Sequence, residues 1–177
     1  MKSDTKKIII DTETTGFDLI EGHKLVEIAA IEIDKNDIQT GVVFHAYINP
    51  ERDVSEEVVA IHGLDRDFLE VYPTFAVYKK EFLHFIKGKE IIGHNIHFDL
   101  SFLNNEIGFE LPNKVTDALE MARKAFPNQR NHLDALIERL NIKIKHSPYN
   151  GALLNVLYLH EVYKGLKNEQ KIRKDVV

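Results

Sequence analysis

Two carboxylates directly follow an apolar run near the N-terminus. Ile8–Ile10 precede Asp11 and Glu13, and a Thr-Thr-Gly turn comes next. A run of β-branched residues bounded by turn residues is typical of a buried strand, and residues two apart on a strand point to the same face. We therefore expect both carboxylates to point the same way at the end of this strand. Because buried carboxylates are costly without a compensating charge, the pair predicts a cation-binding site.

A third acidic residue, Asp99, ends the segment His94–Asp99, which follows a short apolar run. An acid at the start of a helix is also favoured by the helix dipole, so Asp99 alone indicates either a capping residue or a ligand. Together with Asp11 and Glu13, it indicates a set of oxygen ligands. Such a set favours Mg²⁺ or Mn²⁺.

The elements that must position these acids change in character along the chain. Apolar runs bounded by turn residues predict strands over 8–10, 25–34, 42–48, 90–93 and 115–116. Capping residues and helical spacing predict helices over 56–62, 75–86, 98–107, 117–126, 133–140 and 148–164. This order predicts an α/β fold, with helices packed on a mixed sheet. The first strand is the most uniformly apolar, so we expect it at the centre.

Composition indicates an ordinary globular protein. The 177 residues are 44% hydrophobic and 29% charged, which favours one domain over residues 1–164. Residues 165–177 are polar and charged, and we expect a short flexible tail there. The net charge of −5 argues against a generally basic nucleic-acid coat, and the absence of cysteine excludes thiolate zinc sites. We see neither a membrane span nor a signal peptide, so we expect a cytoplasmic protein.

Two motifs resemble those of a known nuclease family. Ile10–Gly16 is similar to the first motif of the DEDD exonucleases, and His94–Asp99 is similar to their second motif, HNxxFD. Over about residues 7–164 the chain resembles the epsilon-type exonuclease subunits of bacterial DNA polymerase III. The resemblance implies a ribonuclease H-like fold with a five-stranded mixed sheet and helices on both faces. It also implies proofreading-type 3′→5′ hydrolysis of DNA by two divalent metals.

The same resemblance implies roles for individual residues and partners. It makes Asp11, Glu13 and Asp99 ligands of two Mg²⁺ or Mn²⁺ ions. It assigns contacts with the terminal nucleotides to Thr14, Thr15, His62, His94, Asn95 and Phe98. The implied partners are a single-stranded or frayed DNA 3′ end and the polymerase III core.

The third family motif, HxAxxD, departs from the pattern at its two chemical positions. Asn150 stands where the general-base histidine belongs, and Asn155 stands where the fourth aspartate belongs. An amide takes no proton near neutral pH, and a general base contributes about 10²–10⁴ in rate. Asn155 keeps one oxygen and so stays a weak metal ligand, but losing the fourth charge weakens the binding of one metal ion. We therefore predict an exonuclease whose activity is weakened or lost.

Two alternatives stay open. The chain is either a catalytically inactive exonuclease-fold module that binds DNA ends or a polymerase, or an exonuclease that trims RNA, because nothing in the sequence discriminates the 2′-hydroxyl. Arg123 and Lys124 could meet DNA phosphate, although scattered basic residues are more often a solvated surface.

Overall fold

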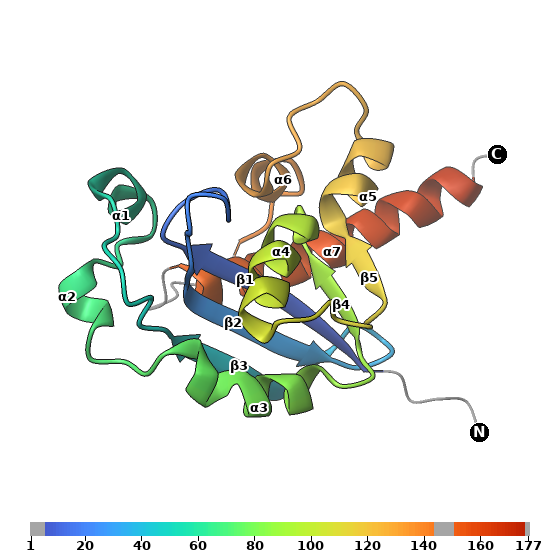
Figure 1. The fold of residues 1–177 in the computed structure, drawn as a ribbon. Coiled ribbons are helices and arrows are strands. Elements are labelled where there is room, and N and C mark those ends of the chain that lie inside the picture. The colour runs from blue at the N-terminus through green and yellow to red at the C-terminus, as the bar shows by residue number, and fades with distance from the viewer. Residues whose placement is uncertain (1–5, 144–150, 176–177) are drawn as a thin grey trace.

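A five-stranded mixed sheet forms the centre of the computed structural model, which describes residues 6–143 and 151–175 (Figure 1). The strands are β1 Lys7–Thr14, β2 Leu25–Ile33, β3 Gln39–Tyr47, β4 Glu90–Gly93 and β5 Val115–Asp117. They lie in the order β3-β2-β1-β4-β5. Strand β1 pairs antiparallel with β2 and parallel with β4, so the predicted mixed sheet and the central first strand are both confirmed.

Helices cover both faces of this sheet, as expected. The helices are α1 Glu56–His62, α2 Arg66–Leu69, α3 Phe75–Ile86, α4 Ile96–Ile107, α5 Ala118–Ala125, α6 Leu133–Arg139 and α7 Ala152–Asp175. One core packs α3 and α4 on one face, and a second core packs α5, α6 and α7 on the other (Figure 1). In the described part of the chain, no helix is long and apolar enough to cross a membrane.

The alternation along β1 decides which helices meet the acidic residues. Ile8 and Ile10 belong to the core under α3 and α4, whereas Ile9 belongs to the core under α7. Because side chains two apart share a face, Asp11 and Glu13 continue the face of Ile9. The sheet therefore delivers both carboxylates to the side that α7 covers.

The structure differs from the expected elements in three places. Helix α2 was not expected, and α4 begins before Phe98, because Asn95 takes a left-handed conformation with φ of 61° and starts the helix there. Helix α7 continues through Asp175 instead of ending at residue 164. The physical reason is that Leu166 is fully buried and Lys167 pairs with Asp37, so part of the expected tail is anchored. Residues 148–150 of the expected last helix lie outside the described residues.

We expect α7 to stabilise the fold mainly through the side chains that it packs against the sheet. Leu159 is fully buried in the core between α7 and the sheet, whereas Ile172 on the same helix is 57% exposed. We expect Leu159→Ala to lower the free energy of unfolding by about 2–5 kcal/mol through lost burial and a residual cavity. We expect Ile172→Ala to change it by less than about 0.5 kcal/mol. Urea denaturation of both variants measures this, and equal effects would contradict the packing described.

Candidate active site

Three acidic side chains meet at the end of β1. Asp11 and Glu13 are partly buried, and Asp99 on α4 is buried. The Asp99 Oδ1 atom accepts the Thr12 backbone N–H at 3.0 Å and the Thr12 hydroxyl at 2.7 Å. These two bonds join the first turn of α4 to β1, so the two elements present their carboxylates at the same end of the sheet.

Asn155 of α7 lies directly against this cluster. Its Nδ2 atom donates to Asp11 Oδ2 at 3.0 Å and to Glu13 Oε1 at 3.4 Å. The amide thus satisfies both carboxylates with neutral N–H donors. Asn150, the expected position of the general base, lies outside the described residues.

Crowded carboxylates at this site favour protonation. Burial first, and the negative charges of Asp11 and Glu27 second, raise the pKa of Glu13 to about 8. Burial also raises the pKa of Asp11, although the bond from Asn155 opposes the shift. Burial and the Asp11 charge raise the pKa of Asp99 well above its usual value. All three pKa values are raised because the charged carboxylates are disfavoured here. A bound cation would stabilise their charged forms.

Glu27 is the member of this site that the sequence analysis missed. It lies on β2 directly opposite Glu13 and is only 1% exposed. A signal was available, because a glutamate inside the otherwise apolar segment Leu25–Ala30 needs a buried partner. That partner could not be named from the sequence, because it lies far away in the chain.

The two threonines after Glu13 make bonds within their own loop. The Thr14 hydroxyl donates to the Gly16 carbonyl at 2.5 Å. The Thr15 hydroxyl lies 3.0 Å from His23 Nδ1 and accepts the Lys24 N–H at 3.1 Å. Their hydroxyls therefore shape the exit of β1, and their contacts with a nucleotide stay a prediction.

His62 ties α1 to the end of β1. Its Nδ1 atom accepts the Leu64 N–H at 3.0 Å, which leaves Nε2 to donate to the Thr14 carbonyl at 3.2 Å. Burial lowers the pKa of His62, in agreement with a neutral ring that makes both bonds. The ring lies beside the acidic cluster but is committed to the backbone on both nitrogens.

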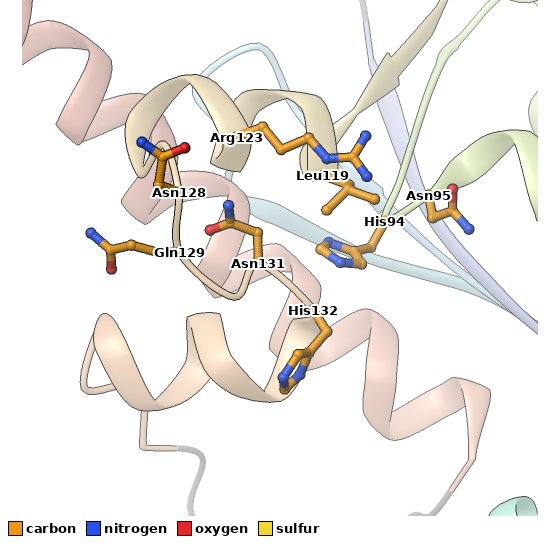
Figure 2. A pocket seen from close by; sticks show the side chains of 8 residues that line it. All are labelled: His94, Asn95, Leu119, Arg123, Asn128, Gln129, Asn131 and His132. Atoms are coloured by element: carbon orange, nitrogen blue, oxygen red, sulfur yellow. The ribbon is translucent and has the colours of Figure 1, made fainter.

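His94 and Asn95 line a pocket of about 510 Å³ together with residues of α5 and of the segment between α5 and α6 (Figure 2). The other lining residues are Leu119, Arg123, Asn128, Gln129, Asn131 and His132. The lining is rich in hydrogen-bond donors and contains no carboxylate. The His94 Nδ1 atom is buried without a hydrogen-bond partner among the described residues. Phe98 lies apart from this pocket and packs on Phe102, with ring centroids 5.1 Å apart.

A second group of side chains of the types that ligate metals comes from α4, the end of β5 and α5. In the described ranges, His97, Asp117 and Glu120 are the group of three whose ligand atoms all lie within 4.8 Å of one another. The acids of the predicted site are spread more widely than this. However, Asp117 already accepts the N–H groups of Asn95 and Leu119, which explains its place as the N-cap of α5.

Comparisons with known proteins place this geometry in context. Residues 8–150 match the profile of the exonuclease (RNase T) family. The chain is 42% identical over 178 residues to DNA polymerase III subunit epsilon of Salmonella typhimurium, covering 94% of this chain and 73% of that relative.

Two solved structures share the fold. Exonuclease X in complex with 5′ overhanging duplex DNA has a TM-score of 0.74 at 22% identity, covering 91% of this chain and 90% of that chain. The zinc-bound complex of Escherichia coli exonuclease I with single-stranded DNA has a TM-score of 0.80 at 18% identity, covering 98% and 43%. The α/β architecture is therefore the ribonuclease H-like fold of exonucleases.

The raised pKa values predict that stability falls with pH when no metal is present. Because the folded Glu13 carboxyl holds its proton up to about pH 8, the folded state binds more protons than the unfolded state from about pH 4.5 to 8. The free energy of unfolding in EDTA should therefore decrease over this range. Asn155→Asp adds a fourth carboxylate and should steepen the decrease. Urea denaturation at pH 5 and pH 8 measures both effects.

Asn168→Asp is the matched control for that experiment. It makes the same chemical change at an exposed position on α7. Its pH dependence should parallel that of the unchanged chain. If Asn155→Asp also runs parallel to the unchanged chain, the fourth position does not interact with the acidic cluster.

Proposed function

Since the chain belongs to the exonuclease family, with epsilon subunits of bacterial DNA polymerase III among its relatives, we propose that it removes nucleotides from the 3′ end of DNA by metal-dependent hydrolysis. The observation that carries the proposal is the convergence of Asp11, Glu13 and Asp99, all with raised pKa values, at one end of the sheet. Metal-dependent hydrolysis needs carboxylates that hold divalent cations against the scissile phosphate, and these three residues are the carboxylates that would do so.

The donor set fits two divalent cations such as Mg²⁺ or Mn²⁺. All three ligands are carboxylates, their known contacts are with neutral N–H and O–H donors, and their crowding is relieved by positive charge. When bound, such cations activate water and stabilise the leaving 3′ oxygen. Asp99 would be held ready by Thr12, and Asp11 and Glu13 by the end of β1.

We also propose that hydrolysis is slow in this chain. Asn155 offers the cluster a neutral amide in place of a fourth carboxylate, so two cations would be balanced by three charges instead of four. Its N–H groups donate to Asp11 and Glu13, and a cation bound there would have to displace those bonds. By resemblance Asn150 occupies the position of the general base and cannot take up the proton.

The same Asn155 contacts favour a second candidate function. A neutral amide at this position adds less repulsion than a fourth carboxylate, which suits a module that holds a DNA end or a polymerase without bound metal. A relative named as a subunit of DNA polymerase III supports association with a polymerase core, in the cytoplasm. Hydrolysis and binding are separable by experiment.

A restoration experiment tests the hydrolytic function. We expect the unchanged chain to shorten a 5′-labelled, 3′-mismatched DNA primer slowly with Mn²⁺. Asn150→His combined with Asn155→Asp should raise the single-turnover rate constant by about 10²–10⁴. Adding Asp99→Asn to that pair should abolish the gain. An RNA primer of the same sequence tests the RNA-trimming alternative.

Two outcomes would contradict this assignment. An unchanged chain as fast as the double variant would show that the two asparagines do not limit the rate. A double variant that binds the primer without shortening it would instead support the non-catalytic module.

We expect the phosphate groups of DNA to bind in the pocket that His94 and Asn95 line, because its side chains are rich in hydrogen-bond donors. Arg123 lines the pocket near His94, whereas its neighbour Lys124 is exposed on α5 and does not line it (Figure 2). We expect Arg123→Ala to weaken the binding of a single-stranded oligonucleotide and to reduce the slope of log K against log salt by about 1. Lys124→Ala is the control and should leave the slope unchanged. Fluorescence anisotropy at several salt concentrations measures both, and equal slopes would exclude the pocket.

A further inference from the structure

Glu27 is a buried carboxylate whose two oxygens are both committed. Its Oε1 atom lies 2.8 Å from His45 Nε2 on β3, and its Oε2 atom accepts the Ala152 backbone N–H of α7 at 3.0 Å. Burying a charge is expensive unless its hydrogen bonds are made, and here both are made. One side chain thus joins β2, β3 and the first turn of α7.

The backbone before Ala152 is shaped to allow this contact. Gly151 has φ of 66°, a left-handed conformation that favours glycine, and a methyl group there would overlap the Glu27 carboxylate. The helix therefore approaches Glu27 as closely as its backbone permits. The pairing of β2 with β3 does not require this close contact between Gly151 and Glu27. We therefore connect the contact with the position of α7.

The turn that Glu27 holds is the turn that carries Asn155. The Gly151 carbonyl accepts the N–H groups of Leu154 and Asn155, both at 3.1 Å. The Asn155 side chain then reaches Asp11 and Glu13. A continuous chain of hydrogen bonds runs from Glu27 through one helical turn to the acidic cluster.

We propose that Glu27 is a positioning residue, which holds the first turn of α7 so that the side chain at position 155 faces Asp11 and Glu13. The proposal rests on the proposed function, because it takes the acidic cluster as the metal site. In this proposal Glu27 acts through the turn and not as a metal ligand, since one of its oxygens lies against His45 and the other accepts the Ala152 N–H.

Glu32 provides a matched control on the same strand. It is also buried, at 3% exposed, and it pairs with Lys6 and Lys89 and accepts from Thr40. None of these partners belongs to α7. Replacing Glu32 removes a buried, hydrogen-bonded carboxylate from β2 without touching the turn at Ala152.

The test compares Glu27→Met with Glu32→Met in two measurements, because methionine keeps the length of the side chain and loses its acceptors. The first is backbone hydrogen exchange along α7 in metal-free protein. Glu27→Met should lose protection at Ala152–Asn155 and keep it near Leu159. The second is Mn²⁺ binding measured by electron paramagnetic resonance. Glu27→Met should weaken the affinity by about 10–100-fold, the usual effect of residues that orient ligands. Glu32→Met should change neither.

Glu27→Gln is the conservative rescue. Its amide can accept from Ala152 and donate to a neutral His45, so it should keep both the protection and most of the Mn²⁺ affinity. If Glu27→Met does not fold, His45→Ala replaces it. The His45 side chain is 25% exposed, and its removal frees one oxygen of Glu27, which should loosen the same turn to a smaller extent.

The proposal is overturned if Glu27→Met, or its replacement, loses protection evenly along α7, or if it weakens Mn²⁺ binding no more than Glu32→Met does. Failure of the proposed function looks different. In that case the unchanged protein binds no Mn²⁺ at the acidic cluster, and hydrogen exchange alone decides whether Glu27 positions the turn.

Discussion

Burial of several carboxylates close together at one end of the sheet is the constraint on which the site depends, because burial is the main cause of their raised pKa values. Asp11, Glu13 and Glu27 lie on adjacent strands, and Asp99 joins them from α4. In a partly buried setting these charges cannot all persist without partners. Neighbouring groups supply these partners. Thr12 bonds Asp99, the Ala152 N–H bonds Glu27, and Asn155 bonds Asp11 and Glu13.

This arrangement connects the stability of the fold with its chemistry. The amide of Asn155 donates to Asp11 and Glu13, but its bond does not offset the burial that raises the pKa of Asp11. A carboxylate at the same place would increase the repulsion and make the cluster depend on cations.

Much of the fold and three acidic residues of the site could be predicted from local sequence. The other features depend on partners that are distant in the chain. The run Ile8–Ile10 indicated a central strand because it is apolar on both faces. The role of Glu27 was hidden, since its partners lie 18 and 125 residues away in the chain. The length of α7 was hidden for the same reason, because Lys167 finds Asp37 at a separation of 130 residues. Local patterns cannot report pairs that only the fold brings together.

The anchoring of α7 by its distal half has a mechanical consequence. Leu166 is buried, Lys167 pairs with Asp37, and the His160 ring bonds the Asp37 carbonyl at 2.7 Å. A helix that is packed along most of its length cannot shift as a rigid unit when a ligand binds at the acidic cluster. The first turn is held as well, because Ala152 and Val156 are fully buried and Glu27 accepts the Ala152 N–H. Position 155 therefore faces the acidic residues from a helix that is held at both of its ends, so a ligand must fit the site as the helix presents it.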